Sequence, residues 1–246
     1  MRVLLALWRV CRVVAHVLAG LCTIVFVFQR LSTAQQQARV QQWAAEMLAA
    51  LGIRLEVHGA PVASGPALIV ANHISWLDIL VLHASRYSRF VSKADVRRWP
   101  LIGPMATAAG TLYIERESRR DAMRVVHHMA DALRAGDVLA VFPEGTTSDG
   151  VSLLPFHGNL LQAAIVADVP VQPVALNYLD AATRATARTI VYIDDDTLVG
   201  SVWRTLAGPE VTVVVRYGEP QRCSGMDRRV WASGLRDAVS ALRQAS

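Results

Sequence analysis

The chain has 246 residues, of which 53% are hydrophobic, and it carries a formal net charge of +5. The length suits one domain with an appendage, and the hydrophobic share exceeds the roughly 45–50% of soluble proteins. All but one of the 25 cationic side chains are arginines, the exception being Lys93. This usage fits GC-rich coding better than a selected nucleic-acid surface, so we expect no nucleic-acid partner. The three cysteines lack C-x-x-C spacing, which argues against a disulfide framework or a zinc site, and we expect neither a metal nor a cofactor.

The N-terminus has the composition of a membrane-attached segment. Residues 13–28 form an uncharged apolar run, with Arg9 and Arg12 before it and Arg30 after it. No small-residue cleavage site follows the run, so we expect the segment to remain attached. As a helix it would cover about 24 Å, which is less than the hydrocarbon core of about 30 Å. A short span, entry into one leaflet and a buried core helix therefore all remain open.

A second helix is predicted at residues 35–51. Its apolar side chains, among them Trp43 and Met47, recur at helical spacing, and Gly52 suits the end of the helix. A helix of this kind suits either the membrane interface or packing on a domain. We therefore divide the chain into N-terminal membrane-associated helices at residues 1–51 and an α/β domain at residues 52–246.

The rest of the chain alternates short apolar runs with helical patterns. Strands are predicted at residues 53–57, 67–71, 90–92, 112–114, 138–142, 171–176, 189–193 and 211–217. Helices are predicted at residues 76–83, 119–134, 158–167, 198–206 and 227–245. This alternation predicts a single α/β domain with a mainly parallel central sheet flanked by helices. In such sheets the loops that follow the strands carry the functional residues.

Residues 72–78 form the first loop with catalytic potential. They follow a predicted strand and open a predicted helix, which places His73 in the loop and Asp78 in the first helical turn. The carboxylate can then hold one imidazole nitrogen while the other faces a substrate hydroxyl, as a general base requires. A second interpretation stays open, because Ser75 and Asp78 have the spacing of a capping box.

Three later loops lie at strand ends. Residues 110–116 end in Arg116, which suits either phosphate binding or a solvated ion pair. Residues 142–148 place a glycine among hydroxyl side chains, which suits either an anion-binding loop or an ordinary polar turn. Residues 169–174 begin a strand with prolines that fix its entry.

Together these loops resemble the lysophosphatidic-acid and glycerolipid acyltransferase family, the bacterial 1-acylglycerol-3-phosphate acyltransferases in particular. The resemblance covers residues 67–174, with four motifs in the family's order. It implies that His73 is the catalytic base and Asp78 its partner. It implies that the acceptor's phosphate is bound by Lys93, Gly110 and Arg116. It further implies that the acceptor site is shaped by Glu144, Gly145 and Thr146 and bounded by Pro173.

Three positions depart from the family pattern, of which Tyr113, in place of the common phenylalanine, is a mild change. Thr147 stands where arginine is frequent, and His157 stands where lysine is frequent. Both changes weaken contacts to a phosphate, which leaves the identity of the acceptor open. The resemblance also implies that residues 1–51 seat the enzyme on one leaflet of the cytoplasmic membrane, with the active site at the cytoplasmic face.

The predicted function is O-acyl transfer from acyl-CoA or acyl-carrier protein to the hydroxyl of a lysolipid, with membrane lipids as partners. The expected acceptor is 1-acylglycerol-3-phosphate, and the product would be phosphatidic acid. The alternatives are a lyso-ornithine lipid or another lysophospholipid as acceptor, and a non-catalytic membrane lipid-binding protein. A covalent acyl-enzyme through Ser75 is disfavoured, because that hydroxyl suits a helix cap.

Overall fold

A computed structural model describes residues 2–114 and 119–245 of the chain. Its centre is a seven-stranded sheet in the order β1-β7-β6-β2-β5-β3-β4. The strands are β1 (Ile53–His58), β2 (Ala67–Ala71), β3 (Arg89–Lys93), β4 (Leu112–Ile114), β5 (Val138–Val141), β6 (Val171–Asp180) and β7 (Val211–Tyr217). Every neighbouring pair is parallel except β6 and β7. The predicted α/β class with a mainly parallel sheet is confirmed.

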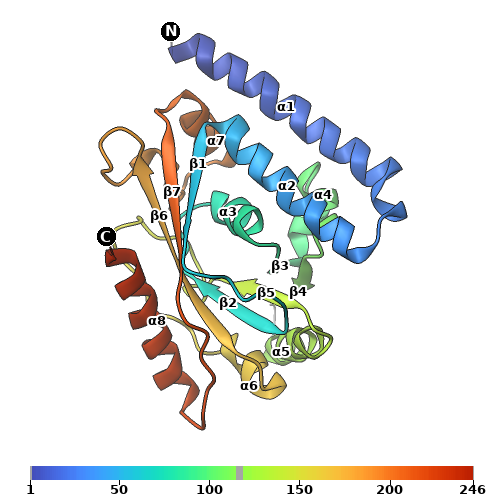
Figure 1. The fold of residues 1–246 in the computed structure, drawn as a ribbon, viewed down its shortest axis with the longest axis vertical. Coiled ribbons are helices and arrows are strands. Elements are labelled where there is room, and N and C mark those ends of the chain that lie inside the picture. The colour runs from blue at the N-terminus through green and yellow to red at the C-terminus, as the bar shows by residue number, and fades with distance from the viewer. Residues whose placement is uncertain (1, 115–118, 246) are drawn as a thin grey trace.

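Helices cover both faces of this sheet (Figure 1). One face packs against α2 and α3, and the other packs against α5, α6 and α8. The helices of the two layers are α2 (Thr33–Leu51), α3 (Leu77–Ser85), α5 (Arg119–Arg134), α6 (Leu161–Ala167) and α8 (Arg228–Gln244). The strand β2 between them is buried over its whole length, as its unbroken apolar sequence requires in a central parallel strand.

The prediction of a strand at residues 189–193 is wrong. The chain there forms a single 3-10 turn, η3 (Arg188–Ile190), and Ile190 is buried in the core. The following backbone pairs with the loop after β2, since the Tyr192 amide donates to the Ile74 carbonyl at 3.1 Å. Apolar β-branched residues that suit a strand therefore pack beneath that loop instead.

Two short elements between β3 and β4 were not predicted, and one strand is longer than predicted. The 3-10 turn η2 (Ala94–Arg98) and the helix α4 (Ile102–Ala108) are too short to show a periodic apolar pattern. The strand β6 continues past residue 176 to Asp180, because its last residues still pair with β7.

The N-terminal helix α1 (Arg2–Phe26) has 25 residues and is therefore about 37 Å long, well beyond the predicted apolar run. In the described part of the chain it is the one helix long and apolar enough to cross a membrane, and only 11% of its apolar window is buried. Its exposed apolar side chains are Val3, Leu4, Leu5, Leu7, Trp8, Val14, Leu18, Val25 and Phe26.

The helix α1 lies along the outside of α2 rather than projecting away from the domain (Figure 1). At its middle, His16 and Trp43 stack with ring centroids 5.1 Å apart, and each side chain bonds the other's backbone carbonyl. The buried Gly20 lets the helices approach, because a Cβ there would lie 2.6 Å from the Trp43 indole nitrogen. Contacts to α2 thus fix one side of α1 and leave the opposite side apolar and exposed.

A buried arginine fixes the N-terminal half of α1. Arg9 is only 4% exposed, and its Nη1 donates to the carbonyls of Leu206 and Gly208, each at 3.1 Å. These carbonyls lie at the C-terminal end of α7 (Leu198–Ala207), where the partial negative charge of a helix favours a cation. The guanidinium also lies directly against Gly52, where a Cβ would be 2.4 Å from Nη2.

We expect Arg9→Leu to lower the stability of the protein in detergent. The substitution leaves two carbonyls unpaired, which costs about 1–3 kcal/mol, and at this size each kcal/mol lowers the melting temperature by about 2–4 °C. Thermal unfolding of the purified full chain measures the effect. The matched control is Arg12→Leu, because Arg12 lies on the exposed side of α1. Equal melting temperatures for the two variants would contradict the role of Arg9.

Candidate active site

The candidate site lies at the C-terminal edge of the parallel strands β2, β5 and β3. His73 follows β2, Glu144 follows β5, and Lys93 ends β3. Because these three strands are parallel neighbours, their C-terminal ends meet at one edge of the sheet. The sheet therefore gathers side chains that are up to 71 positions apart in the sequence, as between His73 and Glu144.

The imidazole of His73 is held by the carboxylate of Asp78. Nδ1 of His73 lies 2.8 Å from Oδ2 of Asp78, which is completely buried, whereas the imidazole is 20% exposed. Oδ2 also accepts from the backbone amides of Ile74 at 2.6 Å and Ser75 at 2.9 Å. Since Nδ1 is occupied, Nε2 is the nitrogen that can meet a substrate hydroxyl. This is the base-and-orienter geometry that the spacing predicted.

The predicted capping box is only half formed. The Asp78 carboxylate does accept from the Ser75 amide, but the Asp78 amide donates to the Ser75 carbonyl and not to its hydroxyl. Within the described part of the chain the Ser75 hydroxyl is buried without a hydrogen-bond partner. Its predicted role as a helix cap is therefore wrong. One carboxylate both closes the loop before α3 and orients the imidazole.

Tyr178 is the partner that sequence reasoning missed. Its buried hydroxyl donates to Oδ1 of Asp78 at 2.7 Å. Burial, followed by the charge of Asp78, raises the pKa of the Tyr178 phenol well above its ordinary value, so the phenol keeps its proton and donates it. Tyr178 reaches the site because β6 runs on to Asp180, beyond the end predicted from its apolar run.

Phe142 supports the other side of the imidazole. Its ring stacks on His73 with centroids 3.9 Å apart and an angle of 7° between the planes. Phe90 from β3 lies behind Phe142 at 5.9 Å. The stack fixes the plane of the imidazole. Phe142 begins the predicted anion-binding loop, and no separate role was predicted for it.

The loop after β5 clamps the backbone of His73. Glu144 accepts from the His73 amide at 2.7 Å with Oε1 and from the Leu154 amide at 2.9 Å with Oε2. The Ser148 amide and hydroxyl both donate to the His73 carbonyl, at 2.8 and 3.0 Å. Burial raises the pKa of Glu144, and the two amide bonds oppose that rise. The geometry thus gives Glu144 a supporting position beneath the catalytic loop.

Three of the remaining predicted site residues lie at the surface, and a fourth lies outside the described residues. Gly145 and Thr146 are exposed in the turn after Glu144, and Gly145 has φ +75°, which favours glycine. Lys93 is exposed at the end of β3. Arg116 lies outside the described residues.

The carbonyls of two further predicted site residues, Gly110 and Pro173, accept hydrogen bonds within the fold. Gly110 has φ +79°, and its carbonyl accepts from the Arg89 Nε at 2.7 Å. Pro173 is buried inside β6, and its carbonyl accepts from the Gly218 amide at 2.9 Å. Their roles toward an acceptor remain predictions.

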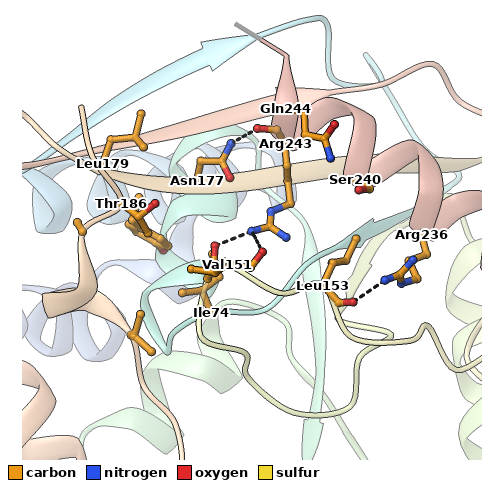
Figure 2. Close-up of a pocket in the computed structure, with 14 residues that line it drawn as sticks. Ile74, Val151, Leu153, Asn177, Leu179, Thr186, Arg236, Ser240, Arg243 and Gln244 are labelled. Atoms are coloured by element: carbon orange, nitrogen blue, oxygen red, sulfur yellow. Dashed lines mark hydrogen bonds between the residues drawn. The ribbon is translucent and has the colours of Figure 1, made fainter. Parts of the chain in front are cut away.

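A cavity of about 340 Å³ lies beside residues 72–78, and Tyr178 is among its lining residues. Figure 2 shows Ile74 in its wall. Two arginines of α8 border it. Arg243 donates to the carbonyls of Gly150 and Val151, and Arg236 donates to the carbonyls of Leu153 and Leu154. These bonds fasten the loop after Ser148 to α8, so the arginines are engaged by backbone in this structure.

No group of three metal-ligating side chains occurs within residues 2–114 and 119–245. The carboxylates nearest the candidate base are instead engaged by backbone amides and by Tyr178. The chemistry that this arrangement offers is proton transfer by an oriented imidazole.

Comparison with known proteins finds acyltransferases by both family model and sequence identity. A family model described as "Acyltransferase" matches residues 54–177. The lyso-ornithine lipid O-acyltransferase of Pseudomonas aeruginosa is 40% identical over 89% of this chain and 85% of its own length. The 1-acyl-sn-glycerol-3-phosphate acyltransferase of Neisseria gonorrhoeae is 41% identical over 69% of this chain and 66% of its own length.

A solved structure shares the fold. The crystal structure of the 1-acyl-sn-glycerophosphate acyltransferase from Thermotoga maritima superposes with a TM-score of 0.71 at 19% identity, covering 100% of this chain and 99% of that one. The resemblance drawn from the four motifs is confirmed by the family match and by these relatives. The chain belongs to the acyltransferase family and is an acyltransferase enzyme.

Proposed function

We propose that this enzyme moves a fatty acyl group from a thioester donor, acyl-CoA or acyl-carrier protein, to the free hydroxyl of a lysolipid. The observation that carries the proposal is the pairing of His73 with the fully buried Asp78 at 2.8 Å. No covalent acyl-enzyme is needed, because an oriented imidazole can activate the acceptor hydroxyl directly.

In the proposed reaction Nε2 of His73 takes the proton of the acceptor hydroxyl as its oxygen attacks the thioester carbonyl. A new C–O bond forms, the C–S bond breaks, and the thiolate leaves with the proton that the imidazolium returns. Asp78 stabilises the imidazolium through Nδ1, and Phe142 fixes the plane of its ring. Tyr178, Glu144 and the loop amides keep these groups in place without touching the reacting atoms.

The first candidate acceptor is 1-acylglycerol-3-phosphate, which would give phosphatidic acid. Lys93 supports it, because this exposed cation ends β3 at the same sheet edge as His73. The name of the Neisseria gonorrhoeae relative supports it as well. Arg116, which the family resemblance assigns to the phosphate, would complete the pair of cations.

The second candidate acceptor is a lyso-ornithine lipid. The Pseudomonas aeruginosa relative with that activity in its name aligns over 89% of this chain. In addition, the Thr147 hydroxyl donates to the Tyr192 carbonyl, and the exposed His157 lies next to Gly145. Neither side chain supplies the permanent cation that is frequent in the family at these two positions.

We further propose that residues 1–51 attach the enzyme to the cytoplasmic membrane, with the domain of residues 52–246 and its active site on the cytoplasmic side. The exposed apolar side of α1 supports attachment, and the docking of its other side on α2 favours a helix lying in one leaflet over one that crosses the bilayer alone. An acceptor lipid would then reach His73 from the same leaflet.

We expect His73→Ala to reduce transfer by about 10²–10⁴-fold, the usual loss on removing a general base. The variant should keep its fold, because the imidazole is partly exposed and the His73 backbone bonds remain. Thiol release from acyl-CoA and thermal unfolding measure the two effects. The control is His58→Ala, an exposed histidine at the end of β1. Near-normal turnover of the His73 variant would refute the mechanism.

We expect Tyr178→Phe to keep the core filled while removing one donor from Asp78. With one hydrogen bond fewer, the Asp78 carboxylate is held less firmly and orients the imidazole less well, so kcat should fall by about tenfold, the size expected for losing one hydrogen bond to a charged group. Thiol release at saturating acyl-CoA measures the loss.

The matched control for that experiment is Tyr217→Phe. Tyr217 is also buried in the sheet, and its hydroxyl bonds Ser85 at 2.6 Å rather than the catalytic loop. We expect a loss of stability with little change in kcat. A loss of kcat of the same size in both variants would mean that Tyr178 has only a structural role.

We expect Arg116→Ala to distinguish the acceptors. A charge-assisted hydrogen bond to phosphate contributes roughly 1.5–3 kcal/mol, so kcat/KM for a phosphomonoester lysolipid should fall by about one to two orders of magnitude. The loss with lyso-ornithine lipid should be smaller. The control is Arg54→Ala, an exposed arginine paired with Glu210. Equal losses with every acceptor would remove the phosphate role, and a wild type that prefers lyso-ornithine lipid would favour the second candidate.

A further inference from the structure

A short apolar segment between β3 and α4 is exposed without an evident structural reason. All six residues 97–102, with the sequence RRWPLI, are exposed. Trp99 is 47% exposed, Leu101 52% and Ile102 38%. Three large apolar side chains together on a surface loop indicate an interaction site, whereas single exposed ones do not.

The backbone of this segment presents its apolar side chains outward. Leu101 has φ +65°, an unfavourable conformation for a residue with a branched side chain. The turn is closed by the amide of Ile102 donating to the Pro100 carbonyl and that of Gly103 donating to the Trp99 carbonyl. Gly103 is required there, because a Cβ would lie 2.2 Å from the Arg97 carbonyl oxygen.

The segment is connected to α1 through the helix α4. The helix α4 packs on the C-terminal half of α1, and a Cβ at Gly20 would lie 3.3 Å from the Met105 methyl group. Figure 1 shows α4 beside α2 and below α1. Residues 97–102 therefore lead into a helix that contacts the proposed membrane helix.

The charges beside the apolar residues favour a lipid surface over a protein partner. Arg97 and Arg98 are exposed, and neither has a carboxylate partner among the described residues. Arginine next to tryptophan is typical of the membrane interface, where the ring lies at headgroup depth and the cation meets lipid phosphate.

We infer that residues 97–102 form a second lipid-contact element, in which Trp99, Leu101 and Ile102 enter an anionic leaflet and the two arginines bind its phosphates. The inference rests on the proposed membrane attachment through α1. It adds a contact at the edge of the sheet that carries the candidate site, because the segment follows the C-terminal end of β3, next to β5.

A second contact has a mechanical consequence. A single amphipathic helix lying in a leaflet leaves the domain free to roll about the helix axis. Contact at residues 97–102 removes that freedom and turns the edge that bears His73 toward the headgroups. The acceptor hydroxyl can then meet the imidazole while the acyl chain of the lysolipid stays in the leaflet.

The test compares two forms of acceptor, using the full-length enzyme. Trp99→Asp and Leu101→Asp are assayed in two ways. In one the lysolipid is embedded in phosphatidylglycerol vesicles, and in the other a short-chain lysolipid is dissolved below its critical micelle concentration. We expect kcat/KM on vesicles to fall about tenfold or more, the size expected for losing the burial of one such side chain. Activity on the dispersed acceptor should change little. The control is Val230→Asp, a 62% exposed apolar residue of α8 on the opposite layer.

A binding measurement decides the inference without turnover. Brominated phosphatidylglycerol vesicles should quench part of the tryptophan emission of the wild type, and Trp99→Phe should remove a measurable share of that quenching. If Trp99→Phe leaves the quenching unchanged, the segment does not enter lipid. Equal activity losses on vesicles and on dispersed acceptor would likewise overturn the inference, by assigning the segment to the active site itself.

Discussion

The buried carboxylate of Asp78 is the group on which the site depends. It has no exposed surface, and it accepts from the imidazole of His73, the amides of Ile74 and Ser75 and the phenol of Tyr178. A buried charge is tolerated only when its hydrogen bonds are made. The loop, the helix start and β6 must therefore all be in register before the imidazole is oriented, so folding and catalytic geometry are set by the same bonds.

Sequence reasoning could find the His73–Asp78 pair because the two residues are only five positions apart, in a loop and in the first turn of the helix that follows it. It could not find Tyr178, which is 100 positions from its partner and lies past the apolar run that marked the strand. The missing information was the pairing of β6 with β7, which extends β6 beyond the end of β2. Long-range register of this kind leaves no local pattern in the sequence.

The fold was predictable to a larger extent than the roles within it. Apolar runs gave the parallel strands because central strands are buried on both faces, while residues 189–193 show that the same composition also suits a turn packed in the core. Glu144 illustrates the limit for roles. The motif suggested contact with the acceptor, and only the structure shows both carboxylate oxygens bonded to the amides of His73 and Leu154. Residue type alone does not say which partner a carboxylate has.

The helix α7 connects α1 to the loop that carries His73. At its C-terminal end, Leu206 and the following Gly208 accept from Arg9 of α1, and in its first turns the Ser201 hydroxyl accepts from the indole of Trp76, inside the loop that carries His73. These bonds, each 3.1 Å long, link α1 to the loop that carries His73 through one helix. If α1 lies in one leaflet as proposed, and residues 97–102 prevent rotation about its axis, these bonds also set the height and direction of the imidazole. For a lipid acceptor, this connection would supply the positioning that a soluble substrate would reach by diffusion.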